Sequence, residues 1–176
     1  ADHFAQLDKR RRKIEAWDYG DGWADLEGDP AAQLAVVTFG SCTAPVREGL
    51  AHAATEGVAA RLISLRLLAP LPTRQLLAAL DGVRRVLVIE QNHTAQLYKY
   101  LRAECDLPGR VTSLHRPGAL QFSPGEIHRH LARIRKVTDE RRESMVDRLL
   151  LHLHPALRVE DPGEGLADKW VADQLG

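Results

Sequence analysis

The 176 residues are enough for one domain with a substantial core and attached arms. Lysine plus arginine and aspartate plus glutamate number 24 each, so a formal net charge of zero gives no electrostatic basis for binding nucleic acid or an anionic membrane. No apolar run approaches the roughly 18 to 20 residues of a membrane span, and the N-terminus lacks a signal-peptide core. Because the sequence does not begin with Met, we expect a piece of a longer chain.

The cysteines and histidines do not form a metal-binding pattern. Cys42 and Cys105 are far apart in the sequence, with no second Cys or His pair beside either. His128 and His130 point to different faces of a predicted helix, and the pair in 152–154 lacks a third ligand. We therefore expect no metal site in this chain alone, reduced thiols and a cytoplasmic location.

The N-terminal 33 residues begin with a charged amphipathic segment and continue into a stretch rich in Gly and Asp. We assign 1–33 to an N-terminal arm or linker. The C-terminal flank, 138–176, starts with another charged helix and is assigned to a helical tail. Both flanks carry apolar residues without an obvious sheet to complete. They are interpreted either as arms on a neighbouring chain or domain, or as segments that pack back on their own domain.

Between the flanks, short apolar runs alternate with helical patterns, so 34–137 is predicted to form an α/β domain. The predicted strands are 34–39, 58–68, 84–91 and 110–115. The predicted helices are 44–57, 73–81 with Thr73 as N-cap, and 95–106. Unbroken apolar strands that alternate with helices are typical of a mostly parallel sheet covered on both faces. The prediction is a three-layer α/β/α fold.

The last helix of this domain has a capping box. Ser123 is placed at the N-cap, Pro124 at the first helical position and Glu126 three residues after the N-cap. One face is apolar, with Ile127, Leu131 and Ile134. The opposite face is basic, with Arg129, Arg133, Arg135 and Lys136. We interpret the basic face as a solvated one.

Polar residues follow two of the predicted strands. Ligands of parallel α/β sheets gather at the carboxyl ends of strands. Gly40, Ser41 and Thr43 follow the first strand and could present backbone amides to an anion, but the Walker lysine and the G-x-G-x-x-G spacing are absent. The alternative is simple helix capping by Ser41 or Thr43. Cys42, at the same helix start, could have a lowered pKa, but no base accompanies it and we do not assign it a nucleophilic role.

The strand 84–91 ends in the second polar cluster. Glu90 is followed by Asn92, His93 and Thr94. This cluster could bind a ligand or face a partner subunit. In the alternative interpretation, Glu90 is hydrogen-bonded to neighbouring loops and Thr94 starts the next helix.

These segments together resemble a known enzyme domain. The matching stretches are "HFAQLDKRRRKIE" (3–15), "VREGL" (46–50), "LRLLAPLP" (65–72), "VIEQNHTAQL" (88–97) and "RPGALQFSPGEI" (116–127). In this order they resemble the second domain of the α subunit of 2-oxoacid:ferredoxin oxidoreductases, the 2-oxoglutarate type especially. The resemblance covers about residues 3–135. Cys42, the inserted-looking "GALQ" (118–121) and the C-terminal tail depart from the family pattern.

The resemblance implies a transketolase C-terminal-like fold, with a mixed sheet of five strands of which one is antiparallel. The fifth strand must then lie in a flank, for example at 156–161. The implied holoenzyme decarboxylates a 2-oxo acid on thiamine diphosphate with Mg, passes electrons through iron–sulfur clusters to ferredoxin, and forms an acyl-CoA. The "GDG" at 20–22 lacks the continuation of a magnesium–thiamine loop, and no cluster cysteines are present. We therefore expect a chain that is inactive alone and has no catalytic residue.

The role expected from the resemblance is docking in an oligomer, to the thiamine-binding β subunit and the rest of the α subunit, with a possible contribution to the CoA entrance. Arg66, Glu90, Asn92 and Gln96 are predicted as interface or positioning residues. Gly40, Ser41 and Thr43 are candidates for anion or CoA binding. Two alternatives stay open. One is the C-terminal domain of another thiamine enzyme, of transketolase or dehydrogenase β type, and the other is a stand-alone protein-interaction module.

Overall fold

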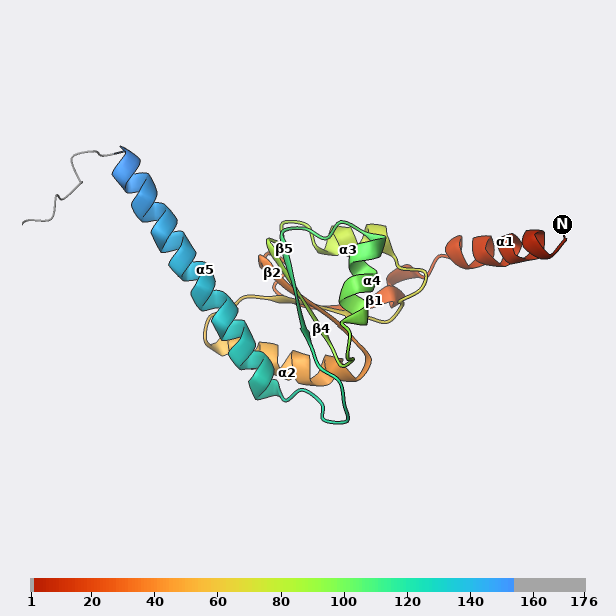
Figure 1. The fold of residues 1–176 in the computed structure, drawn as a ribbon, viewed down its shortest axis with the longest axis horizontal. Helices are drawn as coiled ribbons and strands as arrows, with labels where there is room; N and C mark the ends of the chain where they lie inside the picture. Colours follow the sequence, from red (N-terminus) through yellow and green to blue (C-terminus); the bar gives the residue numbers. More distant parts are fainter. Residues whose placement is uncertain (1, 154–176) are drawn as a thin grey trace, which may run out of the picture. The chain divides into compact units, whose positions relative to one another are not determined.

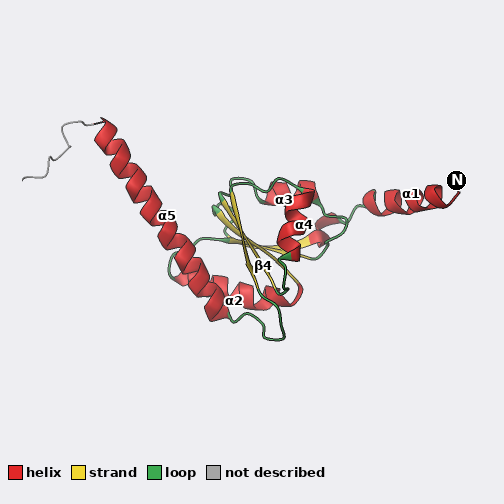
Figure 2. Cartoon of the chain, in the orientation of Figure 1, coloured by secondary structure: helices red, strands yellow, loops and turns green. Residues whose placement is uncertain are grey.

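The structure is a computed structural model that describes residues 2–153 (Figures 1 and 2). It divides into two compact units, Ala1–Arg133 and Ile134–Gly176. The first unit contains the whole sheet and most helices. The long helix α5 (Pro124–Leu153) begins in the first unit and ends in the second.

A five-stranded sheet forms the centre of the first unit, in the order β1-β3-β2-β4-β5. Its strands are β1 (Ala24–Gly28), β2 (Leu34–Phe39), β3 (Arg61–Leu65), β4 (Arg85–Glu90) and β5 (Arg110–His115). β1 pairs antiparallel with β3, and all other pairs are parallel. The mixed sheet with one antiparallel strand is confirmed, as are the four strands predicted from apolar runs.

Helices cover both faces of the sheet, which confirms the three-layer α/β/α prediction (Figure 1). The other helices are α1 (Asp2–Glu15), α2 (Thr43–Thr55), α3 (Thr73–Ala79) and α4 (Gln96–Glu104). α3 and α4 lie on one face, and α2 and the first turns of α5 lie on the other. α5 is seated closely on α2, because a Cβ added at Gly49 would meet Ile127 Cγ2 at 2.8 Å.

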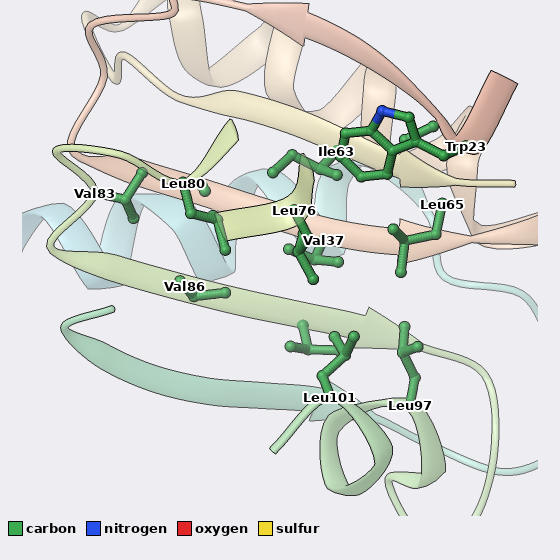
Figure 3. Packing of buried hydrophobic residues seen from close by; sticks show 13 residues of the cluster. Trp23, Val37, Ile63, Leu65, Leu76, Leu80, Val83, Val86, Leu97 and Leu101 are labelled. Carbon is green, nitrogen blue, oxygen red and sulfur yellow. The ribbon is translucent and has the colours of Figure 1, made fainter. Parts of the chain in front are cut away.

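The alternation of side chains along the strands builds a separate core on each face. Val37, Ile63 and Val86 point toward α3 and α4 and pack with Trp23 and the leucines of these helices (Figure 3), and Val88 belongs to the same cluster. The residues between them are equally buried and face the other layer: Val36, Leu62, Leu87 and Ile89. Strands buried on both faces explain why the sequence shows continuous apolar runs rather than alternation.

The fifth strand is β1, in the segment that the sequence assigns to an N-terminal arm. Residues 156–161, which the sequence offers as a fifth strand, lie outside the described residues. β1 is an edge strand with a half-exposed pattern, so "ADLEG" has no apolar run. Trp23 and Ala24 nevertheless join the core at 6% and 7% exposure, and Leu26 is 56% exposed. The first part of the flank is the helix α1, which buries none of its residues.

Three local predictions need correction. β3 is shorter than the predicted 58–68, because beyond the strand the amides of Arg66 and Leu67 both donate to the carbonyl of Trp23. Thr73 does not cap α3: it is the first helical residue, after Pro72 at the N-cap, and its hydroxyl donates to the carbonyl of Leu71. The charged helix predicted after residue 138 is the continuation of α5, since no helix-breaking residue separates the two segments.

Candidate functional site

The four parallel strands end at one edge of the sheet, where the polar residues predicted from the sequence gather. The segments that leave this edge are 40–42 after β2, 66–72 after β3, 91–95 after β4 and 116–123 after β5. Such an edge is where α/β proteins place ligands, because loops and helix N-termini converge there. The parallel register therefore brings the two polar clusters of the sequence to the same side of the domain.

Glu90 lies at this edge with no exposed surface. It lies two residues after Val88 and four after Val86, so the strand alternation directs it to the face that α4 covers. Its carboxylate accepts hydrogen bonds from the backbone amides of Leu97, at 2.7 Å, and Tyr98, at 2.9 Å. These amides belong to the first turn of α4, so the carboxylate satisfies donors that a helix cannot pair internally.

Asn92 completes the cap of α4. Its side-chain amide donates to Glu90 Oε2, and its Oδ1 accepts from the backbone amides of Thr94 and Gln96 at 3.2 and 3.0 Å. The N-cap residue is Ala95, which adopts a left-handed conformation with φ of 52°. Thr94 therefore does not start the helix, and Glu90 and Asn92 position the first turn of α4 from inside the chain.

The two other predicted interface residues are accessible. Gln96 is exposed at the start of α4. Arg66 directly follows β3, its side chain is 63% exposed, and one guanidinium nitrogen lies 3.3 Å from Asp25 Oδ1. An exposed ion pair of this kind stabilises a fold by about 0 to 1 kcal/mol, so it does not fix Arg66 in place.

The predicted anion-binding residues form a tight turn between β2 and α2. Gly40 has φ of +60° and begins a short 3-10 helix, Gly40–Cys42. Gly40 and Ser41 are exposed and Thr43 is half-buried. The N-cap of α2 is Cys42, without a side-chain capping bond, so the interpretation as capping by Ser41 or Thr43 is wrong. Anion binding at this turn stays a prediction.

Cys42 is a core residue of the same edge, at 3% exposure. Burial is the largest influence on its thiol and raises the pKa, and the negative charge of Glu90 acts in the same direction. A hydrogen bond from the backbone at Gln91 opposes this shift without reversing it. The lowered pKa that a helix N-terminus could give is therefore not found, and the thiol stays protonated at neutral pH.

The connection from β5 to α5 contains an interaction network that sequence reasoning recognised only in part. The capping box is confirmed: the amide of Ser123 donates to Glu126 Oε2 at 2.7 Å, and the amide of Glu126 donates to Ser123 Oγ at 3.3 Å. Arg116 Nη1 donates to Glu126 Oε1 at 2.8 Å, and the guanidinium lies 4.4 Å from the ring centre of Phe122. The bond from Ser123 and then the contact with Arg116 lower the pKa of Glu126 from 4.5 to about 2.

A glutamine connects the loops that follow β4 and β5. Gln91 Nε2 donates to the carbonyl of Gly118 at 2.6 Å and to that of Leu120 at 3.1 Å. Both acceptors lie in the "GALQ" segment that departs from the family pattern. The sequence contains the signal for Arg116 in its "RP" motif, but nothing in it indicated that Gln91 holds this loop.

This chain has few side chains that could bind the implied cofactors. Its two cysteines are fewer than the four thiolates that an iron–sulfur cluster takes, so such a cluster does not fit this chain alone. The "GDG" forms the 3-10 helix Gly20–Trp23 that leads into β1. In the part of the chain that the structure describes, no three His, Cys, Asp or Glu residues are grouped as metal ligands. None of the helices described is both long enough and apolar enough to cross a membrane.

The sheet order, the two helical layers and the capped edge define the chain as an α/β domain of the three-layer class with a mixed, mostly parallel sheet. The family described as pyruvate:ferredoxin oxidoreductase core domain II matches residues 32–127. This is more than half of the chain, and the chain belongs to that family. The match begins just before β2 and ends in the first turn of α5.

One curated relative agrees with this assignment, and one solved structure shares the fold. The chain is 41% identical over 102 residues to "2-oxoacid:ferredoxin oxidoreductase 2, subunit alpha" of Aeropyrum pernix, which covers 56% of this chain and 16% of the relative. The fold of this chain is similar to that of the 2-oxoglutarate:ferredoxin oxidoreductase of Magnetococcus marinus, solved with 2-oxoglutarate, coenzyme A and succinyl-CoA bound. The TM-score is 0.60 and the sequence identity is 24%. That match covers 74% of this chain and 22% of the solved chain. The chain thus spans about a fifth or less of either relative.

Proposed function

We propose that this chain serves as a docking domain in the α subunit of a cytoplasmic 2-oxoacid:ferredoxin oxidoreductase, with 2-oxoglutarate as substrate. The observation that carries the proposal is the family match over residues 32–127, supported by 41% identity to an α subunit. The substrate assignment rests on the resemblance to the 2-oxoglutarate type and on the fold shared with a 2-oxoglutarate enzyme.

In this proposal the chemistry belongs to other parts of the holoenzyme. Thiamine diphosphate with Mg supplies the decarboxylation when bound, and iron–sulfur clusters carry the electrons to ferredoxin. The residues of this chain position surfaces for the β subunit and for the rest of the α subunit. Glu90 and Asn92 fix the first turn of α4, which in turn presents the exposed Gln96. Arg66 presents a cation at the same edge of the sheet.

The turn at Gly40, Ser41 and Thr43 is proposed to border the entrance for CoA. Support comes from its place at the carboxyl edge and from the open space around Gly40, where an added Cβ would meet nothing within 4 Å. A backbone that is accessible in this way can approach the phosphate oxygens of a ligand closely.

The experiment that tests the docking role is co-expression of the chain with the thiamine-binding β subunit and the remaining α subunit from the same source. Native mass spectrometry should show all three in one complex. Arg66→Ala and Gln96→Ala should weaken this complex by about fivefold or more each, the threshold above which an interface residue counts as important. Arg102→Ala and Gln75→Ala, exposed residues of the same types, are the matched controls. A chain that remains unbound, or equal effects of all four variants, would contradict the proposal.

A further inference from the structure

A hollow of about 310 Å³ lies between the end of β5, the loop that follows it and the first turns of α5. It belongs entirely to the first compact unit. Its lining residues are Leu114, His115, Arg116, Phe122, Glu126, Arg129, His130 and Arg133. Phe122 is almost fully buried and forms an apolar wall, whereas most of the rim is basic.

One stripe of α5 supplies half of this lining. Glu126, Arg129, His130 and Arg133 follow the i, i+3, i+4, i+7 spacing that places side chains on one helix face. Arg129 and Arg133 are therefore neighbours, and two like charges at this spacing destabilise a helix by a few tenths of a kcal/mol. Both arginines are exposed, as the sequence predicts for a solvated face, and they also line the wall of the hollow.

The positive charge of the hollow is not neutralised by its one carboxylate. Glu126 is engaged by Arg116 at 2.8 Å and by Ser123 at 2.7 Å. Among the described residues, no ion pair involves Arg129 or Arg133. Since the whole chain has a formal net charge of zero, this excess of positive charge is a local feature.

The groups that supply this charge are guanidiniums. Burial, and then the neighbouring charge of Arg133, lower the pKa of His130, so the imidazole is largely neutral at pH 7. Arginine presents planar pairs of N–H donors that match the oxygens of a phosphate, and these bonds are stronger than bonds between neutral groups. A compact hollow of this volume suits a small anion better than an extended acidic peptide, which needs a longer groove.

We propose that this hollow binds the phosphate or diphosphate group of a small organic phosphate, held by the guanidinium groups of Arg129 and Arg133. None of the residues that line the hollow belongs to the turn at Gly40, Ser41 and Thr43, and the site does not depend on the proposed docking role. Arg116 keeps the wall in place through its contacts with Glu126 and Phe122.

The test is titration of the 176-residue chain with inorganic phosphate, diphosphate and ADP at constant ionic strength, followed by isothermal calorimetry and by amide NMR shifts. At least one probe should bind and shift the amides of residues 129–133. Arg129→Gln and Arg133→Gln should each weaken binding by about tenfold, the value of one hydrogen bond to a charged group. Both side chains are exposed, so the variants should keep the thermal midpoint of the wild-type chain.

Arg102→Gln, an exposed arginine on α4, is the matched control for a general effect of net charge. Stronger binding of ADP than of diphosphate would identify a nucleotide as the source of the phosphate, and equal binding would identify the inorganic group as sufficient. The proposal is overturned if no probe binds, or if Arg102→Gln weakens binding as much as the two α5 variants. It is also overturned if an acidic peptide binds to the hollow and none of the three phosphate probes does. None of these outcomes depends on capture of the β subunit.

Discussion

Replacement of Glu90 is the most direct test of how the carboxyl edge is built. In Glu90→Ala the amides of Leu97 and Tyr98 lose their acceptors at 2.7 and 2.9 Å, and the side chain of Asn92 loses one as well. Leu97 is 4% exposed, so water does not easily replace the carboxylate at its amide. The variant therefore leaves buried donors without partners at the start of α4.

The size of the effect follows from these bonds. A buried donor left unsatisfied costs about 1 to 3 kcal/mol, and loss of a helix cap costs about 0.5 to 2 kcal/mol. We expect Glu90→Ala to lower the free energy of unfolding by about 2 to 5 kcal/mol, a large fraction of the 5 to 15 kcal/mol typical of a folded domain. Glu90→Gln should lower the free energy of unfolding less than Glu90→Ala does, because one side-chain oxygen remains as an acceptor. It should still be destabilising, because its new amide group faces backbone donors.

Urea unfolding followed by circular dichroism measures the change, and hydrogen exchange at the amides of Leu97 and Tyr98 locates it. Glu104→Gln, at the exposed end of the same helix, is the control and should change the free energy of unfolding very little. A loss below about 1 kcal/mol for Glu90→Ala would refute the capping role, since a lost cap typically costs about 1 kcal/mol and the unsatisfied buried donors should add to it. An assembled enzyme that is stable but inactive with Glu90→Gln would instead indicate acid–base chemistry.

Two further predictions concern the loops on either side of β5. Gly109→Ala should lower the free energy of unfolding by about 3 kcal/mol, because φ is +65° and a Cβ would lie 2.2 Å from the Arg84 carbonyl that accepts the Arg110 amide. Gly82→Ala, with φ of +71° and open space, should cost only about 1 to 2 kcal/mol in the same urea experiment, and equal losses would show that the contact is unimportant. The carboxylate of Glu126, with a pKa lowered from 4.5 to about 2, contributes stability that is complete above pH 4.5 and is lost as the pH falls toward 2. Thermal midpoints measured across this range should fall less steeply in Glu126→Gln, and parallel curves would contradict the assignment.

The parts of the fold that follow from sequence are those with repeated, local signals. β2 and β5 match their predicted bounds, and β4 differs by one residue at each end. The capping box at the start of α5 is evident in the sequence because all its members lie within four residues. The sequence does not indicate β1, because an edge strand buries only some of its side chains and needs no apolar run.

The cap of α4 could not be derived in the same way, because its members are not local. Glu90 reaches amides seven and eight residues away, and the intervening segment depends on a left-handed alanine. Alanine has no preference for a positive φ, so the residue type does not indicate the left-handed conformation at this position. The sequence therefore does not distinguish an internal structural role of Glu90 from a role at an interface.

The internal role of Glu90 changes which residues of the edge are free to meet a partner. A carboxylate with no exposed surface and its acceptor oxygens already occupied has little capacity left for another subunit or a ligand. Under the proposed docking role, a partner would contact the exposed groups of this edge. These groups are Gln96 on α4 and Arg66 after β3. Substitutions that change binding without changing stability should therefore occur in this second group, and substitutions of Glu90 should affect binding only through the fold.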